Sequence, residues 1–157
     1  MTIDLSDFGQ VKERAEVFYA NLSEIHCPYF KGKVSFNASG LEHLKFKRHG
    51  SARAHKDQYM RLKLLHLAPE ILKTSSTLQG FKETKEFVRV RVHSRTDTLM
   101  KDIAYYEFDA VVKKIRVKVI VKRIADGQPF FWSIIPFWGM NNDTNTRKIH
   151  SGDPESD

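Results

Sequence analysis

The chain has 157 residues, with 26 lysines and arginines against 19 aspartates and glutamates and a formal net charge of +7. A hydrophobic fraction of 41% and a single cysteine, Cys27, exclude collagen, wholesale disorder and a disulfide-stabilised scaffold. This length favours one domain, which we place at residues 1–139, followed by a polar, disordered tail at residues 140–157.

The first expected element is a helix over residues 8–25, because apolar residues recur there every three or four positions. The stripe consists of Val11, Ala15, Phe18, Leu22 and Ile25. Pro28 follows the helix and prevents its continuation. The next run, residues 31–37, alternates like a short, half-buried strand.

Two further helices are expected before residue 73. Ser39 and Glu42 have the spacing of a capping box, which predicts a short helix over residues 41–48. A longer helical stretch is predicted over residues 53–72, with Pro69 starting a new turn. His66 falls in an apolar row of this stretch, so we assign it to packing.

From Leu78 onward the apolar period changes to two, which predicts strands. A two-residue turn at residues 113–114 would pair Ala110 with Val117 in a hairpin. The expected fold class is α+β, in which N-terminal helices pack on one face of a four- to five-stranded antiparallel β-meander.

The positive charge is concentrated in two segments. Residues 31–63 contain nine lysines and arginines against two acids, and residues 85–123 contain eleven against five, whereas both ends of the chain are acidic. If the fold places these segments side by side, they form a surface that attracts a polyanion. The alternative is an ordinary solvated surface that keeps the protein soluble.

Alternation places a set of basic side chains on the solvent face of the predicted sheet, where neighbouring strands could follow successive phosphates of a nucleic acid. This set consists of Arg89, Arg91, His93, Arg116, Lys118 and Lys122. The alternative is that these residues form cross-strand ion pairs with Glu107 and Asp109.

The basic helical region could supply catalytic groups. Cleaving RNA without a metal needs a base for the 2′-hydroxyl proton, a cation for the crowded phosphate and an acid for the leaving oxygen, and histidine with lysine or arginine provides all three. His43, His49 and His55 are the candidates, and each could instead be a solvated or partly packed residue. Their spacing does not suit a zinc site, so we expect no metal and no cofactor.

The order of these elements resembles the ribonuclease superfamily of barnase, EndoU, the tRNase colicins and RelE (BECR), and in particular its phage-associated PBECR-type branch. The residues that carry the resemblance are GLEHLKFKRHG, RAHKDQYMRL, the basic meander and FWSIIPFW, within residues 30–138. The resemblance implies a helical pair on a four- or five-stranded antiparallel sheet. It also implies matching site positions, which are His43, Lys47, Arg53 and Ser133, with Arg61 and Arg91 as phosphate contacts.

We therefore expect a metal-independent endoribonuclease, a toxin or phage-derived effector of the cytoplasm, with RNA as substrate and an acidic antitoxin or immunity protein as a possible partner. In this hypothesis His43 is the general base or acid, and Ser133 orients the phosphate or only makes room for a neighbouring aromatic side chain. The alternative is a non-catalytic RNA-binding module that uses the same cationic face, with Tyr105 stacking a base. A third possibility is a protein-interaction domain that binds an acidic protein. No segment resembles a signal peptide or a membrane span.

Overall fold

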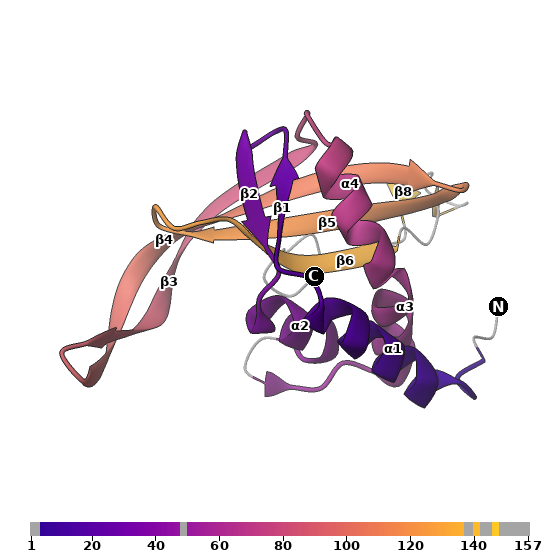
Figure 1. Cartoon of the computed structure of the whole chain (residues 1–157), viewed down its shortest axis with the longest axis horizontal. Coiled ribbons are helices and arrows are strands. Elements are labelled where there is room, and N and C mark those ends of the chain that lie inside the picture. The colour runs from indigo at the N-terminus through magenta and orange to yellow at the C-terminus, as the bar shows by residue number, and fades with distance from the viewer. Residues whose placement is uncertain (1–3, 48–49, 137–139, 142–145, 148–157) are drawn as a thin grey trace.

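The computed structural model of the protein describes residues 4–47, 50–136, 140–141 and 146–147. Helices and strands form an α+β fold in which the helices lie on one side and at one edge of a single large sheet (Figure 1). In chain order the elements are α1 (Phe8–Ala20), β1 (Glu24–Cys27), β2 (Gly32–Ser35), α2 (Ala38–Lys45), α3 (His55–Leu64), the 3₁₀ turn η2 (Leu65–Leu67), α4 (Ala68–Thr74), β3 (Gly80–Val92), β4 (Arg95–Val112), β5 (Ile115–Ile124), β6 (Phe130–Pro136), β7 (Met140–Asn141) and β8 (Thr146–Arg147).

The main sheet has six strands in the order β1-β2-β6-β5-β4-β3. Strands β3 to β6 form the expected antiparallel meander, but β2 adds to β6 in parallel through the pair Ser35–Phe130, so the sheet is mixed. Strand β1 was not expected, because Leu22 and Ile25 continue the apolar spacing of the preceding helix. The helix in fact ends at Ala20, and Ile25 pairs with Val34 in the β1–β2 hairpin.

The predicted hairpin between β4 and β5 is confirmed. Lys113 and Lys114 both have positive φ, 49° and 68°, as a two-residue turn of type I′ requires. The turn pairs Ala110 with Val117, and Asp109 with Lys118, in the expected register.

The helical region begins and breaks at residues other than the expected ones. Asn37, and not Ser39, caps α2, because its side-chain oxygen accepts a hydrogen bond from the Gly40 amide at 3.3 Å. The long helix predicted over residues 53–72 is divided into α3, η2 and α4. At the division His66 is exposed, so its assignment to the core is wrong.

Both faces of the sheet bury apolar side chains, whereas the sequence pattern predicted one apolar and one basic face. On the face covered by the helices, the core contains Phe108, Val117, Val119, Val121 and Phe131. A smaller cluster on the opposite face contains Ile103, Tyr105, Ile120 and Ile135. The β3–β4 register places Arg89 and Arg91 on the first face and the β4–β5 register places Arg116 and Lys118 on the second, so these four residues do not share one surface.

A close backbone approach fixes α2 against β6. A Cβ atom at Gly40 would lie 2.7 Å from Tyr19 Oη and 2.9 Å from Phe131 Cδ1, and closer still to the Phe131 carbonyl oxygen. The Tyr19 hydroxyl donates a hydrogen bond to the Asn37 carbonyl at the start of α2, and burial raises the pKa of this phenol. Because glycine lets the two backbones meet, the next turn of α2 brings His43 next to β6.

Candidate functional site

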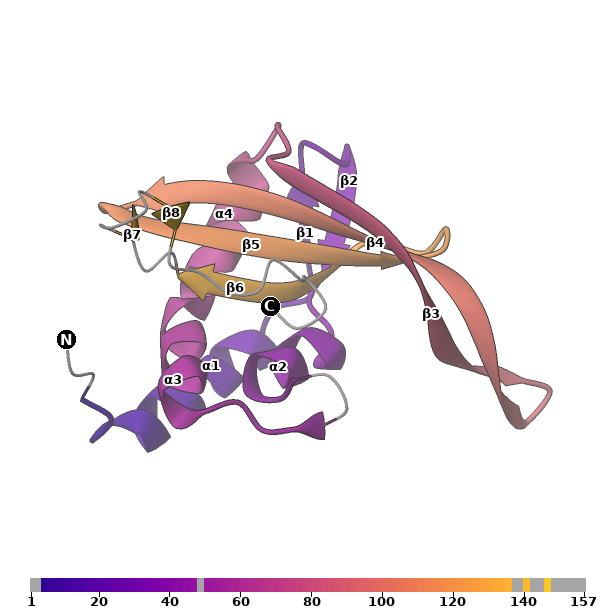
Figure 2. The same cartoon turned by 180° about the vertical axis from the view of Figure 1, so that it is seen from behind.

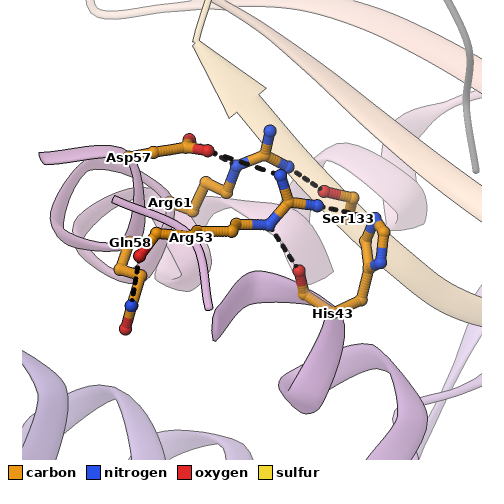
Figure 3. Close-up of polar contacts among 6 residues, drawn as sticks. All are labelled: His43, Arg53, Asp57, Gln58, Arg61 and Ser133. Atoms are coloured by element: carbon orange, nitrogen blue, oxygen red, sulfur yellow. Dashed lines mark hydrogen bonds and ion pairs between the residues drawn. The ribbon is translucent and has the colours of Figure 1, made fainter. Parts of the chain in front are cut away.

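A buried cluster of polar side chains lies where α2 and α3 meet the edge of β6 (Figure 3). Arg53 comes from the segment before α3, and its Nε donates to the His43 carbonyl at 2.8 Å. Arg61, two turns along α3, donates from Nη1 to Ser133 Oγ at 2.7 Å. The cluster therefore connects α2, α3 and β6, three elements that are distant in sequence.

Asp57 holds the two guanidinium groups together. Its carboxylate accepts from Arg61 Nε at 2.7 Å and forms an ion pair with Arg53 Nη1 at 3.3 Å. Asp57 and Arg61 lie one turn apart on α3, whereas Arg53 precedes the helix and is fixed there by Gln58, whose side-chain amide donates to the Arg53 carbonyl at 2.7 Å. Because each guanidinium has several fixed contacts, its orientation is set before any ligand binds.

The His43 side chain makes two contacts, one through the face of its ring and one through a ring nitrogen. Its imidazole stacks on the Trp132 indole, with ring centroids 4.0 Å apart and planes inclined by 21°. Nε2 lies 3.0 Å from Arg53 Nη2. A guanidinium can only donate, so Nε2 is the acceptor and the proton of the neutral ring is on Nδ1.

A β-bulge directs Ser133 toward α3. Val121 pairs with Phe131 and Ile120 with Ser133, so Trp132 is an extra residue in β6. Simple alternation would place Phe131 and Ser133 on the same face, whereas the bulge puts them on opposite faces. Ser133 is fully buried, and its hydroxyl oxygen accepts the hydrogen bond from Arg61 and does not face solvent.

A pocket of about 540 Å³ opens beside this cluster, between α2 and the ends of β5 and β6. Two lysines, Lys47 and Lys122, line it together with aromatic side chains and the His43 ring. The full lining is Ser39, Glu42, His43, Phe46, Lys47, Gly50, Lys122, Ile124, Phe130 and Trp132. The Lys122 ammonium lies 4.0 Å from the centre of the Trp132 ring, on which His43 also stacks, and 3.5 Å from Glu86.

The fold brings together all four residues expected to be catalytic, with Arg61. His43, Arg53, Arg61 and Ser133 form the buried cluster, and Lys47 lines the adjacent pocket. Of the other candidate histidines, His55 is exposed and stacks on Phe8 at 5.1 Å, and His49 lies outside the described residues.

The remaining basic residues lie elsewhere. Arg89, Arg91 and His93 belong to the free end of the β3–β4 hairpin, which extends away from the helices (Figure 2). Arg116 lies next to the β4–β5 turn, six residues or about 20 Å along β5 from Lys122. Lys118 forms an ion pair with Glu107 at 3.2 Å, which is the cross-strand pairing weighed as its alternative role.

The role considered for Tyr105 in stacking a base is wrong. Its ring is buried, and its hydroxyl donates to Glu86 at 2.8 Å. Burial follows from the apolar cluster on the second face of the sheet, which one-sided amphipathicity did not predict.

Two residues of the site, Asp57 and Trp132, were missed, and Lys122 was expected on a cationic sheet face and not in a pocket beside α2. Asp57 was not among the candidate residues, although its spacing of four from both Arg53 and Arg61 is a signal for a shared ion pair. Lys122 and Trp132 meet through strand pairing and the bulge, for which the sequence has no local signal.

The comparisons with known proteins do not assign the chain to a family. No family model matches it, and no curated protein or solved structure matches it significantly. Among the described residues, no helix combines the length and the apolar character needed to cross a membrane.

Proposed function

We propose that the chain is a metal-independent endoribonuclease. Its substrate phosphate binds in the pocket between α2, the C-terminal end of β5 and the N-terminal end of β6. The observation that carries this proposal is the pocket itself, in which Lys47, Lys122 and His43 lie among the aromatic side chains of Phe46 and Trp132. Cations beside aromatic rings are the chemistry of single-stranded nucleic-acid binding. The resemblance of the sequence to BECR ribonucleases of the PBECR-type branch points in the same direction.

The proposed chemistry uses the 2′-hydroxyl of the substrate. An imidazole nitrogen of His43 accepts the hydroxyl proton, the 2′-oxygen bonds to phosphorus, and the bond from phosphorus to the 5′-oxygen breaks. The leaving oxygen takes a proton from Lys47 or from water, which yields a 2′,3′-cyclic phosphate and a 5′-hydroxyl. Arg53 and the two lysines stabilise the negative charge that builds up on the phosphate oxygens.

The contact between His43 and Arg53 sets a condition on this mechanism. Nε2 of His43 is occupied by Arg53 Nη2 at 3.0 Å, and the other ring nitrogen carries the proton. For His43 to act as a base, Arg53 Nη2 must exchange the imidazole for a phosphate oxygen when the substrate binds. Arg61 and Ser133 are then positioning residues, because Asp57 links Arg61 to Arg53.

The same contact favours a second candidate function, a non-catalytic RNA-binding module. In that case the Arg53–His43 bond persists in the complex, and His43 serves only as a wall of the pocket beside Trp132. Lys47 and Lys122 would still bind phosphates, without any change in the RNA.

Cleavage in the presence of EDTA separates the two candidates. We expect the purified chain to cut single-stranded RNA, tRNA or ribosome-bound mRNA and to leave cyclic phosphate ends. His43→Ala should abolish cleavage with nearly unchanged RNA affinity. Lys47→Ala should lower both the cleavage rate and the RNA affinity. His66→Ala, which removes an exposed histidine outside the pocket, is the matched control and should cleave normally. If all three RNAs remain intact while RNA still binds, the binding module is correct.

A further inference from the structure

The outer part of the β3–β4 hairpin has no third strand. Strand β4 pairs with β5 only from Ile103 onward, whereas β3 and β4 continue to pair with each other as far as Val92 and Arg95. Residues 85–102, here called the arm, thus form a two-stranded ribbon that projects from the sheet (Figures 1 and 2). An isolated two-stranded ribbon is marginally stable in water, so a projecting one of this length suggests a surface that binds something.

The two faces of the arm differ in charge and exposure. One face is half-buried along β3 and carries the carboxylates Glu86 and Asp97. On the other, beyond the Lys85–Asp102 pair at the base, every described side chain is exposed and none is acidic. This outer face consists of Phe87, Arg89, Arg91, Thr96, Thr98 and Met100.

The outer face combines apolar and cationic groups. The side chain of Phe87 is 71% exposed and that of Met100 is 55% exposed, and the two are opposite each other in register. Within the described residues, Arg89 and Arg91 form no ion pair and follow Phe87 at two-residue intervals. An exposed aromatic ring followed by guanidiniums and hydroxyls suits a nucleic acid, whose bases stack and whose phosphates accept hydrogen bonds.

The arm begins at the wall of the pocket. Glu86, at its base, accepts hydrogen bonds from Tyr105 and from Lys122, which lines the pocket. Along β3, Arg89 lies about 10 Å and Arg91 about 17 Å beyond Glu86. Glu86 and Lys122 lie on the opposite face of the sheet from Phe87, Arg89 and Arg91, and β3 is the edge strand. A strand of RNA that leaves the pocket therefore has to pass around the β3 edge to reach the outer face of the arm.

From these observations we infer that the arm is a second RNA-binding surface, which holds a single-stranded segment next to the pocket. Phe87 stacks a base of this segment, and Arg89 and Arg91 contact its phosphates. The inference rests on the proposed function, since it takes RNA as the ligand. It adds a substrate class, which is unpaired RNA several nucleotides long, and a binding site separate from the pocket.

Oligonucleotides of two lengths test the arm. We would measure the affinity of fluorescein-labelled 2′-O-methyl oligouridylates of about 12 and about 4 nucleotides, which cannot be cleaved by 2′-hydroxyl attack and do not base-pair. The long one can span both sites, and the short one measures the pocket alone. The double variant Arg89→Ala with Arg91→Ala should weaken the long oligonucleotide about tenfold or more and lower the magnitude of its salt slope by about 1.4, two phosphates at about 0.7 each.

Variants of Phe87 test stacking apart from charge. Phe87→Leu keeps an apolar side chain and should weaken the long oligonucleotide about fivefold or more, whereas Phe87→Trp should restore its affinity. Lys101→Ala is the matched control, because it removes a positive charge from the other face of the arm and should leave the affinity unchanged. All these positions are at least partly solvent-exposed, so the melting temperatures of the variants should match that of the wild type.

The outcomes separate the failure of this inference from that of the proposed function. If the wild type binds the long and the short oligonucleotide with equal affinity, the arm has no RNA-binding role, although the pocket still binds RNA. The same conclusion follows if the arm variants change the affinities of the two oligonucleotides by the same factor. If neither binds, both proposals are wrong. If vesicles of phosphatidylcholine and phosphatidylserine capture the wild type but not Phe87→Leu, while RNA affinity is unchanged, the arm binds a lipid surface instead.

Discussion

Arg61 Nη1 donates a hydrogen bond of 2.7 Å to Ser133 Oγ and so joins α3 to β6 across 72 residues of sequence. Ser133→Ala removes this buried acceptor and leaves a charged donor with one partner fewer. We expect the free energy of unfolding to fall by about 1–2 kcal/mol, measured by urea denaturation. If the proposed function is correct, cleavage should fall as well, because Arg61 fixes Asp57 and through it Arg53.

Ser76→Ala is the control for this change, since Ser76 is exposed in the segment between α4 and β3. Its unfolding free energy should stay within about 0.5 kcal/mol of the wild type. Equal stabilities of the two variants would mean that the Arg61–Ser133 bond does not hold the two elements together.

The second prediction concerns the carboxylate between the two arginines. Asp57→Asn keeps the shape of the side chain but removes the charge that pairs with Arg53 and Arg61. Breaking a fully buried pair costs about 3–5 kcal/mol, but the Asp57 side chain is 35% exposed, so we expect a loss of about 1–3 kcal/mol. Urea denaturation measures the loss.

The matched control is Asp126→Asn, in the exposed turn after β5, where the same change in charge should have little effect. A midpoint of unfolding that is the same in both variants would show that contacts other than Asp57 hold the arginines. Added salt should narrow the difference in unfolding free energy between Asp57→Asn and the wild type only partly, because the two guanidinium groups are buried whereas Asp57 is in contact with solvent.

What could be predicted from the sequence was set by local geometry. The β4–β5 hairpin register followed from period-two alternation on both sides of Lys113. The residues expected to be catalytic were identified by type and by resemblance, and they do meet in space.

The rest depended on contacts between distant segments. The parallel pair Ser35–Phe130 and the bulge at Trp132 arise from how β2 and β6 pack, and no nearby residue in the sequence indicates either. The face assigned to Arg89 and Arg91 was wrong for a similar reason. One-sided amphipathicity was assumed along the whole sheet, whereas the sheet buries apolar residues on both faces.

The third prediction tests the close approach of α2 to β6. Gly40→Ala would place a methyl group against the Phe131 backbone and the Tyr19 hydroxyl, neither of which can move without disturbing the packing of α2. We expect a loss of about 1–3 kcal/mol in unfolding free energy, despite the better helix propensity of alanine. A shift of α2 should also weaken the stacking of His43 on Trp132, which tryptophan fluorescence reports.

Gly9→Ala is the matched control in another helix. A Cβ at Gly9 would have no heavy atom within 4 Å, and the residue lies in the first turn of α1. This variant should be as stable as the wild type or more stable by about 0.5–1 kcal/mol. If Gly9→Ala lowers the free energy of unfolding whereas Gly40→Ala leaves it unchanged, the close contact between α2 and β6 is not important for stability.

The last prediction is a loss of stability at high pH that depends on Tyr19. Burial raises the pKa of this phenol above its ordinary value of 10.0, so the folded state keeps the proton at a pH where the unfolded chain releases it. The folded state then binds more protons than the unfolded state, and stability must fall as the pH rises. This contribution is fully present below about pH 10 and is lost progressively as the pH rises from there toward the folded pKa.

Tyr19→Phe removes the ionisation together with the hydrogen bond to Asn37. The variant should therefore be less stable than the wild type near neutral pH, and the difference should shrink above about pH 10 in urea denaturation series. A constant difference across that range would mean that the Tyr19 phenol ionises equally easily in both states.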